Sequence, residues 1–238
     1  MEENNLTNQS KNNNTQLIAG AILLGALVIG GAIMLRGTAK PVTVVAPAPS
    51  PIPNVEALPP VSSSDNALGS SSAKVAVVVY EDFQCPFCER FFTDTESILR
   101  EKYVTTGKIL FVYRDFAFLG QESIKAAEAA RCAGDQGKFW EYHDYLFTHQ
   151  RGENQGAFVN ANLKSFAVSL GLNTSTFNQC LDSSKHSKEV MDSRTAGAKA
   201  GVNGTPKGFI LKNGKVVSTI DGAEPTATIT AKIDAALK

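Results

Sequence analysis

VAVVVYEDFQCPFCERF, residues 75–91, is the stretch that decides the fold of this chain. It begins with VAVVVY (75–80), a continuous apolar run rich in β-branched residues, which is typical of a strand buried on both faces of a sheet. A helical stretch follows from Pro86 to about Thr106, and a second apolar run, ILFVY, occupies 109–113. A strand, a helix and a strand of these lengths predict a right-handed βαβ unit.

The remainder of the globular part predicts an α/β fold. Apolar residues recur at helical spacing over about 121–201, which predicts a block of helices. The runs GFIL (208–211) and VVSTI (216–220) flank an Asn-Gly dipeptide at 213–214, which is a strong signal for a two-residue hairpin. A final helix is expected to begin near Pro225. The predicted order is therefore β-α-β, a helical block, and β-β-α.

We place the globular domain at 74–238. The composition of the residues before it is that of a tail, an apolar segment and a linker, not of a second globular domain. Residues 1–16 are polar and Asn-rich, which predicts a disordered tail. Residues 17–35 are nineteen positions without a charge, and as a helix they would extend about 28 Å, so they predict a transmembrane helix. A cleaved signal peptide is the alternative, but its apolar core is usually about 7–15 residues long. Residues 36–73 hold seven of the ten Pro and predict a Pro/Ser-rich linker.

Composition and charge exclude several classes of function. The chain has 238 residues with 23 Lys+Arg and 23 Asp+Glu, so its formal net charge is zero. A protein that binds nucleic acid needs a basic face to neutralise phosphates, so we expect no nucleic-acid partner. The four Cys are too few for a small scaffold held together by disulfides.

The motif Cys85-Pro86-Phe87-Cys88 carries the chemistry. It opens the first predicted helix, where backbone N–H groups lack a partner and the helix dipole is positive. A thiolate at Cys85 is stabilised there, which makes it both a nucleophile and a good leaving group. Pro86 suits the first helical position, and Cys88 lies one turn later, close enough to form a disulfide with Cys85.

Two other interpretations of this motif are a structural disulfide and half of a zinc site. A zinc site needs a second pair of ligands at short spacing, whereas Cys132 and Cys180 are single and the three His form no such pair. A CxxC motif that follows a strand in a βαβ pattern is the signature of redox chemistry.

Five segments, in order along the chain, carry a resemblance to a known family. They are YEDFQCPFCERF (80–91), YRDFAF (113–118), AAEAARCAGDQGKFWEYHDYLF (126–147), FNQCL (177–181) and GVNGTP (201–206). With these segments the chain resembles the DsbA-like branch of the thioredoxin superfamily, the membrane-anchored disulfide oxidoreductases of bacterial cell envelopes. The resemblance covers nearly all of 74–238 and implies a thioredoxin fold with a helical insertion at about 119–195.

The resemblance also implies roles for individual residues. Cys85 attacks or is attacked, and Cys88 resolves the mixed disulfide. Pro206 is expected to follow a cis peptide bond, and Thr205 to offer backbone hydrogen bonds to an extended substrate segment. No metal and no organic cofactor is implied.

This chain departs from the family pattern at two places near the cysteines. Many relatives carry an acidic residue six positions before the nucleophile, where this chain has Val79. Glu81 and Asp82 are the acids nearby, and the sequence leaves open whether either of them relays a proton to Cys88. The dipeptide between the cysteines is Pro-Phe instead of Pro-His, which removes one stabiliser of a thiolate.

The other two cysteines are expected to be structural. Relatives often carry Cys at the positions of Cys132 and Cys180, and pairing all four cysteines suits an oxidising compartment. We therefore expect a disulfide between these two residues. Two buried free thiols are the alternative, because free Cys is among the most buried residue types.

Several further residues are expected to have structural roles. Phe139 and Trp140 are placed for packing in the core. Arg114 and Asp115 follow the second strand and are expected to form a loop salt bridge. Lys207 is expected to be solvated, as most isolated charges are, and stabilisation of a nearby thiolate is the alternative.

The motif and the resemblance together predict a membrane-tethered thiol–disulfide oxidoreductase that acts on cysteine-containing proteins. As an oxidase, it would pass its Cys85–Cys88 disulfide to a folding substrate, and a membrane quinone-linked partner would reoxidise it. A reductase or isomerase would use the same residues with the opposite electron flow. A tethered binding module that presents Thr205 and Pro206, with an inert CxxC, is the alternative from another class.

The expected location is the cytoplasmic membrane, which the chain would cross once at 17–35. We expect 36–238 to lie outside the cytoplasm, because disulfide chemistry needs an oxidising compartment. The distribution of Lys and Arg weakly favours the opposite orientation, since Lys11 precedes the apolar run whereas Arg36 and Lys40 follow it.

Overall fold

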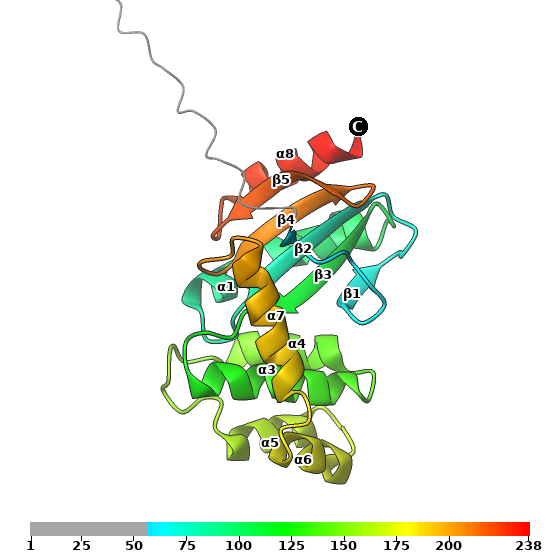
Figure 1. Cartoon of the computed structure of the whole chain (residues 1–238). Coiled ribbons are helices and arrows are strands. Elements are labelled where there is room, and N and C mark those ends of the chain that lie inside the picture. Colours follow the sequence, from blue (N-terminus) through cyan, green and yellow to red (C-terminus); the bar gives the residue numbers. More distant parts are fainter. Residues whose placement is uncertain (1–56) are drawn as a thin grey trace, which may run out of the picture. The chain divides into compact units, whose positions relative to one another are not determined.

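The structure is a computed structural model that describes residues 57–238 (Figure 1). The predicted tail (1–16), the predicted transmembrane helix (17–35) and most of the predicted linker lie outside the described residues. Between residues 57 and 238, no helix is both long and apolar enough to span a membrane.

A five-stranded sheet with the order β1-β3-β2-β4-β5 forms the centre of the described domain (Figure 1). Its strands are β1 (Asn66–Gly69), β2 (Val75–Glu81), β3 (Ile109–Asp115), β4 (Lys207–Lys212) and β5 (Lys215–Asp221). Strands β2 and β3 are parallel, and the other neighbours are antiparallel. The predicted βαβ unit and the predicted hairpin are confirmed.

The helices follow the predicted order. They are α1 (Pro86–Phe91), the π-helical turns η2 (Phe92–Glu96) and η3 (Arg100–Val104) with α2 (Ser97–Leu99) between them, α3 (Gln121–Gly134), α4 (Phe139–His149), α5 (Asn160–Ser169), α6 (Thr174–Asp182), α7 (Ser187–Lys199) and α8 (Thr226–Leu237). The first four are consecutive turns of one helix that connects β2 to β3. Helices α3 to α6 form the insertion, and α7 runs from it back to the sheet (Figure 1).

Helices cover both faces of the sheet. Alternate residues of β2 point to opposite faces, as the period of a strand requires. Val75, Val77 and Val79 pack against the helix after β2 and against α8. Val78 and Tyr80 pack on the other face, near the end of α7.

A glycine lets α7 approach the sheet closely. A Cβ atom at Gly197 would lie 2.8 Å from the ring of Tyr80 and 3.0 Å from that of Phe116. Real Cβ atoms do not make such short contacts, so a larger residue would push α7 away from the sheet.

The insertion is cross-linked by a disulfide between Cys132 on α3 and Cys180 on α6, which we call the structural disulfide. The two Cα atoms are 5.9 Å apart, within the range that a disulfide allows. The structure therefore contains the pairing that the resemblance implies.

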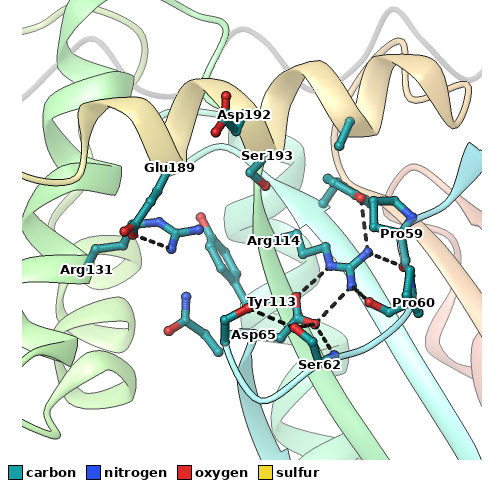
Figure 2. A pocket seen from close by; sticks show the side chains of 14 residues that line it. Pro59, Pro60, Ser62, Asp65, Tyr113, Arg114, Arg131, Glu189, Asp192 and Ser193 are labelled. Atoms are coloured by element: carbon teal, nitrogen blue, oxygen red, sulfur yellow. Dashed lines mark hydrogen bonds and ion pairs between the residues drawn. The ribbon is translucent and has the colours of Figure 1, made fainter.

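The predicted boundary between linker and domain at residue 73 is wrong, because β1 lies before it. Residues 66–69 pair with β3, and Arg114 fastens the segment that precedes them (Figure 2). The guanidinium donates to both carboxylate oxygens of Asp65, at 2.8 and 3.0 Å, and to the carbonyls of Pro59 and Pro60. A strand of only four residues between Ser-rich turns has too short an apolar pattern to be recognised in the sequence.

Three charged residues also differ from expectation. Arg114 and Asp115 do not pair with each other in a loop, because they end β3 and their side chains point to opposite faces. Arg114 pairs with Asp65, whereas Asp115 pairs with Arg131 at 2.6 Å. Lys207 is not solvated: it is buried and pairs with Asp221.

Removal of the structural disulfide is predicted to destabilise the domain. The disulfide closes a loop with a sequence separation of 48 residues, so the double variant Cys132→Ala/Cys180→Ala should lose up to about 4 kcal/mol of unfolding free energy. Urea unfolding of the oxidised wild type and the variant measures this difference. An unchanged midpoint would show that the bond does not constrain the unfolded chain.

Candidate active site

The two cysteines of the motif lie at the first turn of α1. Cys85 is the N-cap residue, with an extended backbone, and Pro86 takes the first helical position as predicted. The backbone N–H groups of Cys88 and Glu89 donate to the carbonyl oxygen of Cys85 at 3.0 and 3.1 Å. Both thiols are free and buried, whereas the ring of Phe87 between them is 53% exposed.

Asp82 fixes the turn that carries the motif from β2 to α1. Its carboxylate accepts hydrogen bonds from the backbone N–H of Gln84 at 2.8 Å and from the hydroxyl of Ser123 at 2.6 Å. It also accepts from the backbone N–H groups of Phe118 and Leu119, at 2.9 and 3.1 Å. Both carboxylate oxygens of Asp82 therefore accept hydrogen bonds that hold two loops together, and this argues against Asp82 as a proton relay.

Thr205 and Pro206 lie beside the first cysteine, although 120 residues separate Thr205 from it in the sequence. The Thr205–Pro206 peptide bond is cis. The sulfur of Cys85 lies 3.4 Å from the carbonyl oxygen of Thr205. The structure therefore brings together at the start of β4 and of α1 the residues that the sequence analysis named for catalysis and substrate binding.

The environment makes Cys85 acidic. Hydrogen bonding from the Cys88 thiol lowers the pKa of Cys85, and burial opposes this effect. The Thr205 side chain and the backbone N–H groups of Cys88 and Phe87 lower it further, so that the pKa of Cys85 falls to about 6. At neutral pH this residue is therefore mainly a thiolate.

The second cysteine behaves in the opposite way. Burial raises the pKa of Cys88 well above that of an ordinary thiol, and its hydrogen bond to Cys85 raises it further. Cys88 therefore stays protonated while Cys85 is ionised. The two thiols are adjacent but have distinct roles, because a thiolate is the reactive form of cysteine.

Glu81, the last residue of β2, is buried near the cysteines. Its carboxyl oxygens have no hydrogen-bond partner among the described residues. Burial raises the pKa of Glu81 well above its ordinary value, and the charges of Glu96 and Cys85 raise it further. A buried carboxyl group that is protonated at neutral pH can donate a proton.

A partly buried cluster of polar and charged side chains lies next to Glu81, and the sequence did not predict it. Arg100 pairs with Glu96 and donates to both carboxylate oxygens of Asp144 at 2.8 Å. The Nδ1 atom of His143 lies 2.8 Å from the same carboxylate. The members come from β2, η2, η3 and α4, so no local spacing could have indicated the cluster.

Two groups of described residues have metal-ligand side chains close together. Glu81, Glu96 and His143 form the first group, but the guanidinium of Arg100 already supplies positive charge to Glu96, so this group does not fit a cation. The second group is the pair of the structural disulfide with His186. Its sulfurs are bonded to each other and therefore hold no metal in this state.

Figure 2 shows a pocket of about 500 Å³ that is separate from the cysteine motif. Arg114 and Arg131 line it, but each already pairs with a carboxylate, on Asp65 and Asp115. The pocket contains none of the residues of the cysteine site, and we assign no chemistry to it.

Comparisons with known proteins agree with this geometry. The family model described as thioredoxin matches residues 62–235. A Rickettsia typhi protein named as a protein-disulfide oxidoreductase is 30% identical over 154 residues, which are 63% of this chain and 56% of the relative. A Bacillus anthracis protein named as disulfide bond formation protein D is 25% identical over 155 residues, 63% of this chain and 71% of the relative.

One further relative has a different name. The Na(+)/H(+) antiporter NhaA 1 of Salinispora arenicola is 33% identical over 148 residues, which are 61% of this chain and 21% of the antiporter. The chain thus spans about a fifth of the antiporter and about half of the Rickettsia relative.

Solved structures share the fold. The crystal structure of Wolbachia pipientis alpha-DsbA1 superposes with a TM-score of 0.68 at 24% identity, over 77% of this chain and 96% of that one. Oxidised BdbD from Bacillus subtilis superposes with a TM-score of 0.64 at 24% identity, over 78% of this chain and 95% of that one. The fold, the cysteine site and the match to the family model agree, and the chain therefore belongs to the thioredoxin family.

Proposed function

We propose that this chain is a DsbA-like thiol–disulfide oxidoreductase that exchanges its Cys85–Cys88 disulfide with cysteines of other proteins. One observation carries the proposal: Cys85 caps α1 with a pKa of about 6 and lies against Thr205. An inert structural disulfide needs no thiolate and no neighbouring backbone that could align a substrate. The names of the Rickettsia and Bacillus relatives support the same activity.

In the oxidising direction, a substrate thiolate attacks the sulfur of Cys85. The Cys85–Cys88 bond breaks, and its electron pair leaves with the sulfur of Cys88. A second substrate thiolate then attacks the first substrate sulfur, and Cys85 leaves as a thiolate. The substrate loses two electrons and the enzyme gains them. The low pKa of Cys85 favours the second step, because a more acidic thiol is a better leaving group.

Glu81 supplies the proton that Cys88 needs in this scheme. Cys88 is fully buried, so a thiolate left on it is costly. Burial raises the pKa of Glu81 well above its ordinary value, and its carboxyl oxygens have no partner among the described residues, whereas Asp82 is engaged in the turn. We therefore assign proton transfer to Glu81. In the reverse direction the same carboxylate accepts the proton from Cys88.

The substrate lies along the segment before β4. The backbone of Thr205 can pair with an extended peptide, and main-chain pairing of this kind tolerates many sequences. The exposed ring of Phe87 offers an apolar contact beside the reacting sulfur. Cysteine-containing proteins with exposed, flexible segments are thus the proposed substrates.

The direction of electron flow depends on the reduction potential. The pKa of about 6 for Cys85 lies between the values of about 3.5 for DsbA and about 7 for thioredoxin. A thiolate less stabilised than that of DsbA corresponds to a less oxidising couple. We propose an oxidase that a membrane quinone-linked partner reoxidises, and this intermediate pKa keeps the reductase or isomerase as the second candidate.

The proposed location is the outer side of the cytoplasmic membrane, with 17–35 as the anchor. Two features support it: the nineteen uncharged residues at these positions, and the structural disulfide, which suits an oxidising compartment.

Variants of the two cysteines test the proposed activity. Cys88→Ser is predicted to accumulate mixed disulfides with substrate proteins, because the resolving thiol is missing, whereas Cys85→Ser should form none. Non-reducing electrophoresis after incubation with a disulfide-bonded substrate protein measures both, because the Cys85 thiolate attacks the substrate disulfide and displaces one of its two sulfurs as a thiolate. Equal trapping by the two variants contradicts the assignment, and a wild type that exchanges no disulfides would leave a binding module as the function.

A Glu81→Gln variant tests the proton transfer. Reduction of the Cys85–Cys88 disulfide by a small dithiol should slow by about 100-fold at neutral pH, the lower end for general acid–base catalysis. The wild-type rate, divided by the concentration of dithiol thiolate, should fall as pH rises through the raised pKa of Glu81, because the protonated carboxyl is the proton donor, and the variant should lose this dependence. Glu101→Gln, at an exposed position on η3, is the control. A wild-type pH profile in Glu81→Gln would refute the role.

A topology reporter fused after Lys238 tests the location. We predict activity only from a reporter that works outside the cytoplasm, against the weak preference of the Lys and Arg distribution. Activity from a cytoplasmic reporter would reverse the orientation and favour a reductase.

A further inference from the structure

Four side chains with metal-ligand atoms meet where α3, α6 and α7 come together. The sulfurs of Cys132 and Cys180 and one ring nitrogen of His186 all lie within 4.8 Å of one another. The Oδ2 atom of Asp135 lies 2.9 Å from Nε2 of His186 and 3.6 Å from the sulfur of Cys180. The two cysteines and the histidine are buried.

Their spacing and chemistry fit zinc. Asp135 follows Cys132 by three positions, and His186 follows Cys180 by six, so each sulfur has a second ligand close in the chain. Thiolate, imidazole and carboxylate are the ligands of tetrahedral zinc sites. In this structure the two sulfurs are bonded to each other, so only the opened disulfide could bind the metal.

A second carboxylate already orients the histidine. The Nδ1 atom of His186 lies 2.8 Å from a carboxylate oxygen of Glu189, while Nε2 faces Asp135. A zinc-ligating histidine commonly has a carboxylate on its other ring nitrogen, which fixes the orientation of the ring. The ring is thus held with Nε2 towards Asp135, whose Oδ2 atom also lies near the sulfur of Cys180, before any metal arrives.

We propose that reduction of the structural disulfide creates a Zn²⁺ site formed by Cys132, Cys180, His186 and Asp135. A dithiol reductant transfers two electrons and two protons to the disulfide and is itself oxidised to a disulfide. Zn²⁺ then binds the two sulfurs as thiolates and releases both thiol protons. Nε2 of His186 and Oδ2 of Asp135 complete four-coordination, with any proton between them displaced to solvent.

The metal replaces one cross-link with another. Side-chain rotation separates the sulfurs until each lies about 2.3 Å from the metal, with the imidazole nitrogen at about 2.0–2.1 Å. Zinc then joins α3 to α6, as the disulfide did, and adds the start of α7 through His186. The insertion keeps a cross-link under reducing conditions, where the covalent bond is lost.

One cation competes with the metal. The ammonium group of Lys185 lies 2.8 Å from the Oδ2 atom of Asp135, and its side chain is 56% exposed, so it can swing into solvent. A Lys185→Ala variant is therefore expected to bind zinc more tightly than the unsubstituted chain.

The test uses the full chain with Cys85→Ser and Cys88→Ser, so that the active-site motif cannot bind metal. The structural disulfide is opened with a phosphine, Zn²⁺ is added, and bound metal is measured after gel filtration. One zinc per chain is expected after reduction and none before it. His186→Ala should weaken binding more than about 10-fold, and Glu189→Gln about 10- to 100-fold. His149→Ala, an exposed histidine on α4, is the matched control and should change nothing.

Circular dichroism and a comparison of zinc binding between the parent and His186→Ala decide whether the site exists. Circular dichroism of the reduced chain shows whether the insertion stays folded. If reduction unfolds it, added Zn²⁺ should restore the helical signal and raise the melting temperature, and no such recovery would overturn the proposal. Zinc binding of equal strength in the reduced parent and in His186→Ala would also overturn it. Because the catalytic cysteines are absent, the result is independent of the proposed function.

Discussion

The stabilisation of negative charge on Cys85 at the start of α1 is the interaction on which the rest of the site depends. The unpaired N–H groups of the helix and the Cys88 thiol lower the pKa of Cys85, and these groups are in place only because β2 delivers the motif at its end. Asp82 holds that turn, and β4 brings Thr205 against the sulfur. The fold therefore positions the Cys85 sulfur and stabilises its thiolate form.

Burial raises the pKa of Cys85, Cys88 and Glu81 alike, but the net shift differs among these three groups. At Cys85, hydrogen bonds outweigh desolvation, so the charged form is favoured. At Cys88 and Glu81, desolvation is the largest effect, and it raises both pKa values and favours the neutral forms. This asymmetry gives one reactive sulfur, one resolving sulfur and one proton donor. Arg100 pairs with Glu96 and Asp144. Its positive charge limits how far the pKa of Glu81 rises.

Local patterns in the sequence were sufficient for the strands, the hairpin and the cysteine motif. A β-branched run, an Asn-Gly turn and CxxC at a helix start each have a short-range physical signature. Strand β1 was missed because four residues carry little pattern, and the salt bridges of Arg114 and Lys207 were missed because their partners are distant in sequence or across a hairpin. The choice between Glu81, which ends β2, and Asp82, which follows it, likewise needed the burial and hydrogen bonds of each carboxyl group, and the sequence does not reveal these.

The activity of this site depends on Cys85 being a thiolate at neutral pH, and a pH titration of thiolate ultraviolet absorbance in the reduced chain measures that state. A transition with a midpoint at about 6 is expected in the wild type and should be absent from Cys85→Ser. A midpoint near 8.5, the value of an unperturbed cysteine, would show that the N-terminus of α1 and the Cys88 thiol do not activate this sulfur.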